Sequence, residues 1–166
     1  MSSPTQPGEE QVIQVLLSQF DKDQMSRILG QVQDELTRRG EAPAQVPVEI
    51  FSTDLSPGES VVKYLKEEKH LRYSEIGLAL GRDERGIWST YQRAARKMPT
   101  PFGTGTAGLY VPLTVLADRR LSLLESVMIH VVDTLHIPVK DCVELLKKSY
   151  STLYTTYARA KRKLAR

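Results

Sequence analysis

The feature of this 166-residue chain that most constrains its fold is an internal repeat. Residues 55–98 align with residues 121–164 at a constant offset of 66 positions and without a gap. Leu55-Ser56 matches Leu121-Ser122, and Arg93-Ala94 matches Arg159-Ala160. The lead-in Val46-Pro47-Val48 also resembles residues 111–113, with one extra residue in the second copy. A repeat of this kind predicts that one supersecondary unit is built twice.

Each copy opens with the residues that start a helix. Ser56-x-x-Glu59 and Ser122-x-x-Glu125 are capping boxes, in which a hydroxyl and a carboxylate satisfy the first free backbone amides of a helix. Pro57 occupies the favoured first helical position of the first copy. We expect each copy to hold this support helix followed by a helix-turn-helix pair, three helices in all.

The helix pair of the first copy reads as a helix-turn-helix over residues 71–98. Residues 73–80 have apolar side chains at helical spacing, and Gly81 can take the positive φ that ends a helix. Asp83 stands where a second helix needs its N-cap. Beyond it, one predicted buried stripe is formed by Ile87, Tyr91, Ala94 and Met98.

The opposite face of this second helix carries side chains that can contact nucleic acid. Its base-edge candidates are Arg85, Trp88, Ser89 and Gln92. The candidates for phosphate contacts, over both copies, are Arg93, Arg96, Lys97, Lys147, Lys148, Thr155, Arg159, Arg162 and Lys163. Trp88 has two open interpretations, a base contact or a hydrophobic residue covered by the other repeat or by a partner.

The second copy differs from the first at the predicted reading face. Ser151, Tyr154 and Ala158 stand where the first copy has Arg85, Trp88 and Gln92. We therefore expect the first repeat to supply most of the sequence specificity and the second to supply phosphate anchoring or a protein contact. Two such units could meet major grooves one turn apart, about 34 Å, or the repeats could pack tightly together.

The stretch resembles region 4 of bacterial sigma factors and the similar output domains of response regulators. The resemblance covers about 45 residues from Leu55 onward, and the matching residues are Ile76, Gly77, Leu80, Gly81, Ile87, Arg93, Ala94, Lys97 and Met98. It implies a helix laid in the major groove with its first turns at base edges. The chain departs from that pattern at Gly77, which replaces a small Ala, at Gly86 inside the second helix, and at Trp88. Nothing in it resembles the promoter-melting region, so a complete sigma factor is not expected.

The remaining segments suggest five parts. We expect a disordered arm at 1–8, a helical segment at 9–40, repeats at 46–98 and 111–166, and a linker at 99–110. The helical segment changes register at residues 21–23, where it either kinks or breaks with Asp23 capping a second helix. Residues 9–39 could form a homodimer or pack on the downstream domain. His70 and His136 both fall at the end of a support helix, where a cation suits the helix dipole.

Charge and composition narrow the class of partner. Residues 1–45 hold four Lys and Arg against seven Asp and Glu, so the basic residues lie downstream. The end of the chain, 157–166, holds five basic residues and no acid, which suits a polyanion or a solvated helix end. A lone Cys142 and no apolar run of about 20 residues favour a cytoplasmic, nucleoid-associated protein without a membrane span.

No motif for catalysis or for a cofactor emerges. One Cys and three scattered His provide no metal-ligand spacing, and no grouping of Ser, His and acid suggests a catalytic set. The glycines of 103–108 match a dinucleotide loop only by pattern, since they join two helical repeats. We expect no enzyme activity, no cofactor and no metal.

The sequence thus predicts an all-α protein, an N-terminal helical segment followed by two tandem three-helix helix-turn-helix repeats. The predicted function is a transcriptional regulator that binds double-stranded DNA sequence-specifically. The alternative is a protein-interaction module that docks on RNA polymerase, on another transcription protein or on its own copy, without base-specific reading. The mild net charge of +3, Trp88 and Tyr154 favour this alternative. RNA is a weaker third partner, because no stacking sheet or RNA motif is evident.

Overall fold

The computed structural model describes residues 12, 14–15, 18–21, 24–25, 27–28, 31–32, 35, 39, 44–103 and 108–166. The chain divides into two compact units. Unit 1 comprises Met1–Ala42 and Thr106–Gly108, and unit 2 comprises Pro43–Gly105 and Leu109–Arg166. The predicted arm at 1–8 and most of the glycine loop at 103–108 lie outside the described residues.

Unit 1 is helical at most of its described positions, with an interruption at 19–21. The Asp21 carboxylate accepts a hydrogen bond from the Gln24 backbone amide at 2.8 Å, and the Gln24 side-chain oxygen accepts one from the Asp21 backbone amide at 3.1 Å. Of the two alternatives left open here, a kink or a break, the described residues show a break, with Asp21 making the cap; Asp23, the expected cap, lies outside the described residues. Val12, Val15 and Val32 are largely exposed within this unit. Dimerisation through residues 9–39 stays a prediction.

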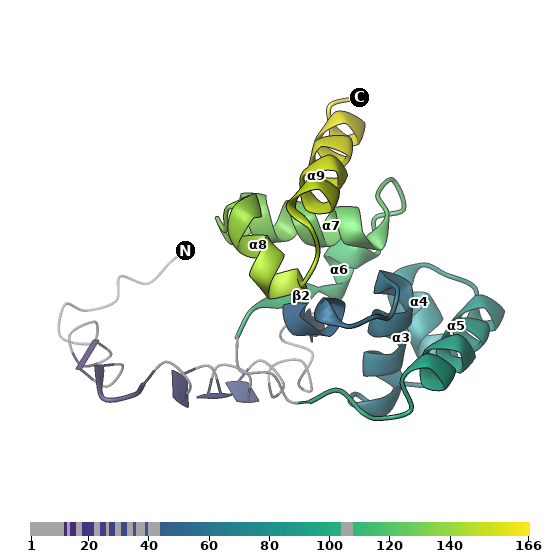
Figure 1. The fold of residues 1–166 in the computed structure, drawn as a ribbon. Helices are drawn as coiled ribbons and strands as arrows, with labels where there is room; N and C mark the ends of the chain where they lie inside the picture. The colour runs from purple at the N-terminus through teal and green to yellow at the C-terminus, as the bar shows by residue number, and fades with distance from the viewer. Residues whose placement is uncertain are drawn as a thin grey trace, which may run out of the picture. The chain divides into compact units, whose positions relative to one another are not determined.

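Unit 2 is mostly helical, which confirms the all-α expectation apart from one small sheet (Figure 1). Its first part runs β1 (Gln45–Pro47), the 3₁₀ helix η1 (Val48–Ser52), α3 (Pro57–Glu67), α4 (Tyr73–Leu80) and α5 (Glu84–Lys97). Its second part runs β2 (Tyr110–Pro112), α6 (Leu113–Leu116), α7 (Leu123–Ile129), the π-helix η2 (His130–Thr134), α8 (Val139–Leu146) and α9 (Tyr150–Leu164). Helices α3, α4 and α5 begin 66 residues before α7, α8 and α9 respectively.

Local sequence accounts for the helix ends. Both capping boxes form, with Ser56 and Glu59 starting α3 and Ser122 and Glu125 starting α7. His70 and His136 both have φ of 55°, so each takes a left-handed conformation just after its support helix. The position that the two histidines share is thus a sharp backbone turn.

The second support helix departs from the continuous helix that the repeat predicts. After Ile129 it continues as the π-helix η2, and the Leu135 amide donates to the His130 carbonyl at 3.0 Å. His130 is nearly buried, and its Nε2 lies 3.1 Å from the Tyr110 carbonyl of β2, which it can reach as a donor. Burial lowers the pKa of His130, although the contact with Tyr110 opposes this. The extra residue in the helical turn coincides with a side chain that reaches the sheet.

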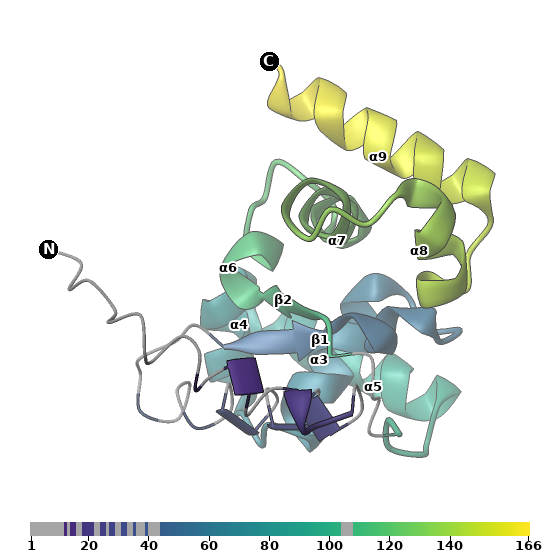
Figure 2. The ribbon, with the colours of Figure 1, turned by 90° about the vertical axis from the view of Figure 1, so that its left-hand side faces the viewer.

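The small sheet joins the two parts of unit 2 (Figure 2). Strands β1 and β2 are antiparallel, and Val46 pairs with Val111 at the centre. The flanking pairs are Gln45 with Pro112 and Pro47 with Tyr110, so the register is symmetric about this central pair. The sequence analysis predicted no strand here, because three residues at each lead-in are too short for a recognisable alternation.

Packing between the parts is reciprocal. The lead-in helix η1 of the first part packs on α8 of the second, and α6 of the second packs on α4 of the first. One hydrophobic core contains residues of both parts, with Val46, Phe51, Val111 and Leu146 at most 1% exposed. The open question of tight packing is thereby answered, since the two parts share one core.

Two polar contacts tie α5 and α9 to their support helices. The Tyr91 hydroxyl donates to Glu67 at 3.1 Å, and the Tyr157 hydroxyl donates to Asp133 at 2.6 Å. Both tyrosines, predicted to be core residues, are half-buried with their rings against the core. Glu67 also binds Lys63, whose side chain is fully buried.

Candidate nucleic-acid interface

The α4–α5 turn has the geometry that its sequence predicts. Gly81 ends α4 with φ 62° and ψ 36°, in the left-handed region. Asp83 caps α5 by accepting from the Arg85 amide at 3.2 Å. The turn is tight, because the Arg82 amide donates to the Gly77 carbonyl at 2.8 Å. A Cβ at Gly77 would lie 2.7 Å from the Arg82 carbonyl oxygen, so the turn leaves no room for a side chain at this position.

Helix α5 turns one face to the core and the other outward. Ile87 and Ala94 are at most 2% exposed. Tyr91 and Met98, which complete the predicted stripe, are half-buried. On the other side Arg85, Trp88 and Arg96 are exposed, whereas Ser89 and Gln92 are half-buried. The predicted reading face is therefore accessible, and its two smaller polar residues lie at its edge.

Trp88 is 53% exposed in unit 2. Of the two ways in which Trp88 could be covered, burial against the other repeat is therefore excluded within unit 2. Contact with a base or with a partner stays open. The hydroxyl of Ser89 donates to the Gly86 carbonyl at 3.1 Å, so it is already bonded to its own helix. Within the described residues, the side chains of Arg85, Gln92 and Arg96 have no protein partner.

The basic residues at the end of α5 are already partly neutralised. Lys97 Nζ lies 3.0 Å from both carboxylate oxygens of Glu59, and Arg93 Nε lies 3.7 Å from Glu59 Oε1. Burial alone would raise the pKa of Glu59, but hydrogen bonds from the Ser56 amide and from Lys97 outweigh it and lower this pKa. Of the predicted phosphate ligands of α5, Arg96 is the one whose cationic head is unengaged within the described residues.

The second part repeats this ion pair. Lys163 Nζ lies 2.8 Å from Glu125 Oε2, at positions 66 residues after Lys97 and Glu59. The pKa of Glu125 is lowered in the same way, since hydrogen bonds from Lys163 and from the Ser122 amide overcome the effect of burial. The sequence analysis found neither pair, because the partners are 38 residues apart and no local spacing connects them.

The outward face of α9 is aromatic at its start and basic at its end. The rings of Tyr150 and Tyr154 stack with centroids 5.9 Å apart, and both side chains are about half exposed. Thr155 is exposed beside them. At the other end a shallow pocket of about 300 Å³ is lined by Arg159, Arg162, Lys163 and Arg166. No protein partner binds the side chains of the three arginines within the described part of the chain.

The two lysines predicted at the α8–α9 turn lie at the aromatic end of α9. Lys147 is exposed and takes the left-handed conformation, φ 49°, that Gly81 takes in the first part. Lys148 is half-buried. A helix of 15 residues is about 22 Å long, so these lysines are separated from the basic end of α9 by about that distance.

The structure adds a pair of arginines that the sequence analysis missed. Arg119 Nη1 donates to the Gly81 carbonyl at 3.0 Å and so reaches the α4–α5 turn from the α6–α7 turn. Beside this contact a pocket of about 340 Å³ is lined by Arg82, Gly86, Thr90, Arg119 and other residues of both parts. Arg120 binds Asp118 through Nε and Nη2. No motif marks residues 119 and 120, since their position comes from how the two parts pack.

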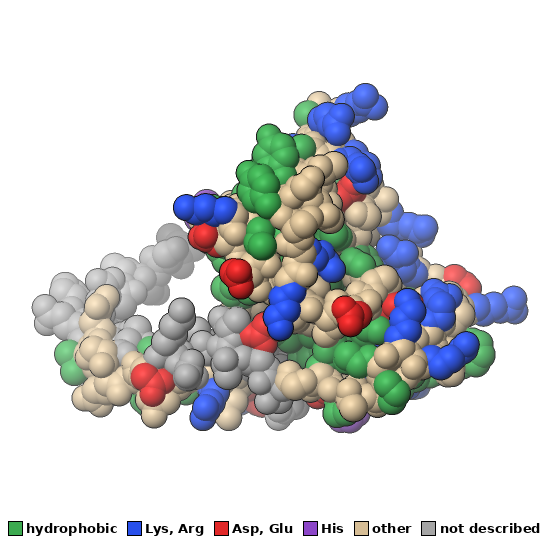
Figure 3. All heavy atoms as spheres, in the orientation of Figure 1, with side chains coloured by type: hydrophobic (Ala, Val, Ile, Leu, Met, Phe, Trp, Pro, Cys, Tyr) green, Lys and Arg blue, Asp and Glu red, His purple; other side chains and the backbone are tan. Residues whose placement is uncertain are grey.

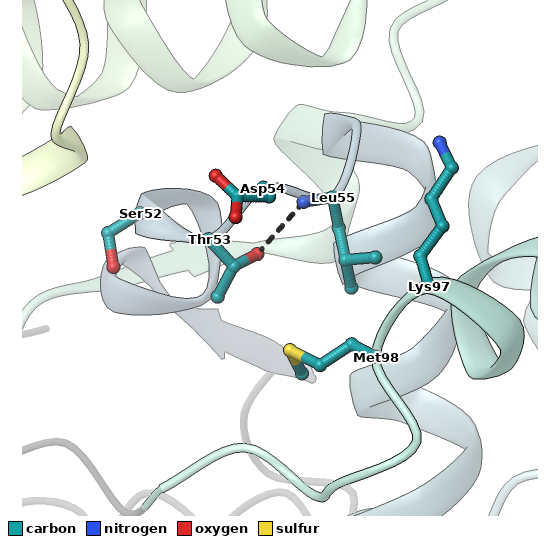
Figure 4. Close-up of a pocket in the computed structure, with 6 residues that line it drawn as sticks. All are labelled: Ser52, Thr53, Asp54, Leu55, Lys97 and Met98. Atoms are coloured by element: carbon teal, nitrogen blue, oxygen red, sulfur yellow. Dashed lines mark hydrogen bonds between the residues drawn. The ribbon is translucent and has the colours of Figure 1, made fainter.

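A further pocket, of about 400 Å³, lies at the C-terminal end of α5 (Figure 4). Its lining comes from Ser52–Leu55 together with Lys97 and Met98. Thr53 Oγ1 accepts from the Leu55 amide at 3.4 Å, and the Lys97 ammonium extends away from these residues. Asp54 supplies the carboxylate of this lining.

The described part of the chain has no group of three or more His, Cys, Asp or Glu residues placed to hold a metal ion. In that part, no helix is long and apolar enough to cross a membrane. Comparisons of the chain with protein-family models, with curated proteins and with solved structures found no match.

Proposed function

We propose that the protein is a regulator that binds double-stranded DNA sequence-specifically through α4 and α5. The observation that carries this proposal is the outward face of α5, which follows a tight glycine turn and presents Arg85, Gln92 and Arg96 without protein partners in the described residues. Unpaired guanidinium and amide groups on one helix face are the groups that read base edges and bind phosphates.

The proposal includes the view that unit 2 consists of two tandem helix-turn-helix repeats resembling sigma region 4. Four kinds of feature support it, each recurring at an offset of 66 residues: helix starts, capping boxes, left-handed histidines and the Glu–Lys ion pairs. Independent local features that recur at one offset are what a duplicated unit produces.

In the proposed complex, the first turns of α5 enter the major groove. Arg85, Gln92 and Ser89 approach base edges, with Trp88 against a base or a thymine methyl group. Arg96 binds a phosphate directly. Lys97 and Lys163 can contribute without leaving their glutamates, because an ammonium has three donors. Arg159 and Arg162 anchor the second repeat on phosphates. The proposed localisation, in the cytoplasm at the nucleoid, follows from this partner.

The test begins with selection from random duplex DNA by the full chain. The double variant Arg85→Ala, Gln92→Ala should then lose about 1 to 3 kcal/mol of discrimination at each base pair that these residues read. The matched control is Ser151→Ala, Tyr154→Ala, which changes the equivalent face of α9 and should keep the preference. If the first double variant kept the full preference, α5 would not be the reading helix.

A second candidate function has an observation of its own. Trp88, Tyr150 and Tyr154 are each more than half exposed, and exposed aromatic side chains are typical of protein interfaces. They suit docking on RNA polymerase or another transcription protein. Salt separates the candidates, because binding through six or more phosphates weakens about a thousandfold or more between 50 and 200 mM salt. An apolar interface would change little.

A further inference from the structure

The two parts of unit 2 are arranged so that the start of α5 and the end of α9 are linked through one turn. Figures 1 and 2 both place α9 at one end of the unit and α5 at the other, with α7 between them. The turn between α6 and α7 spans this interval. On one side of the turn, Arg119 holds the Gly81 carbonyl at 3.0 Å, next to the start of α5. On the other side, Ser122 and Glu125 form the capping box whose carboxylate binds Lys163 of α9.

This turn is basic, whereas its counterpart in the first part is not. The Arg119-Arg120 pair stands 66 residues after Thr53-Asp54. Thr53 and Asp54 line the pocket at the end of α5, next to Lys97. The turn before α3 therefore carries the negative charge of Asp54, whereas the turn before α7 carries Arg119 and Arg120 beside one acid, Asp118.

The result is a row of arginines that takes residues from both parts. We define the basic track as Arg82, Arg85, Arg119, Arg120, Arg159, Arg162 and Arg166, all of which are exposed. Figure 3 shows Lys and Arg side chains following one another along the right-hand side of unit 2, from the end of α9 down to α5. Acidic residues interrupt the row. Asp83 caps α5 and Asp118 binds Arg120, while Glu84 is exposed.

The guanidinium groups of the turn keep donors for a ligand. Arg119 uses one nitrogen on Gly81, and Arg120 uses Nε and Nη2 on Asp118. A guanidinium has five N–H donors, so each residue can bind a phosphate oxygen as well. Arg119 is also positioned by a hydrogen bond to the very turn that starts α5, so its charge is fixed relative to the proposed reading helix.

We propose that the basic track carries the DNA backbone from the start of α5, across the α6–α7 turn, to the end of α9. This inference rests on the proposed function and deepens it. The second part contacts the duplex through Arg119, Arg120 and the basic end of α9, and not through Ser151, Tyr154 and Ala158, which are equivalent to the base-edge candidates Arg85, Trp88 and Gln92 of α5. Lys147, Lys148 and the stacked tyrosines, at the other end of α9, then lie off the DNA.

The experiment measures DNA affinity of the full chain against salt, on a duplex enriched by selection and on a random duplex. The double variant Arg119→Gln, Arg120→Gln should reduce the magnitude of the slope of log K against log salt by about 2. It should weaken binding to both duplexes by the same factor. Arg119→Lys, Arg120→Lys keeps both charges and should keep the slope. The charge-matched control Lys147→Asn, Lys148→Gln should bind as the wild type does; asparagine suits the left-handed position 147.

Thermal melting of each variant separates loss of binding from loss of folding. If the Gln variant melts below the working temperature, the double variant Arg162→Gln, Arg166→Gln is measured in its place. These two side chains have no protein partner in the described residues, so their loss should leave the fold intact. This variant should also reduce the magnitude of the salt slope by about 2.

The basic track is overturned if the folded Gln variants bind as tightly and with the same slope as the wild type, or if the Lys147, Lys148 control loses as much as they do. A wild-type chain that binds neither duplex would instead overturn the proposed function, and this is measured before any variant is made.

Discussion

At the scale of the residue, two glycines lie within helices, and the packing around them requires glycine at only one of the two positions. A Cβ at Gly77 would lie 2.7 Å from the Arg82 carbonyl oxygen, so the tight turn requires glycine there. A Cβ at Gly86 would meet nothing within 4 Å. Glycine inside a helix costs about 1 kcal/mol of stability relative to alanine. At Gly86 no neighbouring atom requires the absence of a side chain.

We therefore expect Gly86→Ala to stabilise the protein by about 0.5 to 1 kcal/mol. Gly77→Ala should destabilise it by about 1 to 3 kcal/mol, because the carbonyl of Arg82 must move. Denaturant unfolding of the two variants beside the wild type measures both effects. Equal changes at the two positions would show that the close contact at Gly77 is relieved at no cost.

At the scale of the element, each support helix is linked to the third helix of its part by a buried glutamate. Glu59 and Glu125 accept from their own N-cap amides and from Lys97 and Lys163. These contacts lower the pKa of both glutamates in the folded protein despite their burial. A lowered pKa contributes stability above the unfolded value, about 4.3, and this stability is lost as the pH falls through the folded value.

Acidification from pH 5 toward pH 3 should therefore destabilise the protein, and Glu59→Gln, Glu125→Gln should reduce this dependence on pH. Glutamine keeps the cap but removes the charge that binds the lysines, so the variant should also be less stable at pH 7. The measurement is the free energy of unfolding at several pH values. Glu144→Gln, an exposed glutamate of α8, is the control. A double variant that loses as much stability on acidification as the wild type would contradict the assignment.

At the scale of the whole molecule, the two parts of unit 2 have one core and should unfold together. Val46 and Val111 pair at its centre and are fully buried. The reciprocal packing of η1 on α8 and of α6 on α4 means that neither part can keep its buried surface alone. The track of arginines depends on this arrangement, since it takes residues from both parts.

Val111→Ala, in the second part, should therefore lower the stability of both parts equally, by about 2 kcal/mol. Trp88, the single tryptophan, reports on the first part. A Trp88→Phe, Tyr154→Trp background reports on the second. We expect the two probes to give the same unfolding midpoint, both with and without Val111→Ala. The control Val139→Ala, at a half-buried site, should shift this midpoint less. Two separate transitions would mean that the parts are independent domains.

The sequence by itself determined where α3 and α5 begin, where α4 ends, and which side of α5 faces the core. Ser56 with Glu59, Gly81 and Asp83 act on atoms within a few residues of themselves, so their effect is readable from the order of residues. Only the tertiary structure decided that β1 pairs with β2, that Lys97 binds Glu59 and that Arg119 reaches Gly81. These contacts join residues tens of positions apart, which no local spacing specifies. The strand pair and the Arg119 contact form because the two parts share one core, and the Lys97–Glu59 pair forms because α5 packs on α3 within the first part.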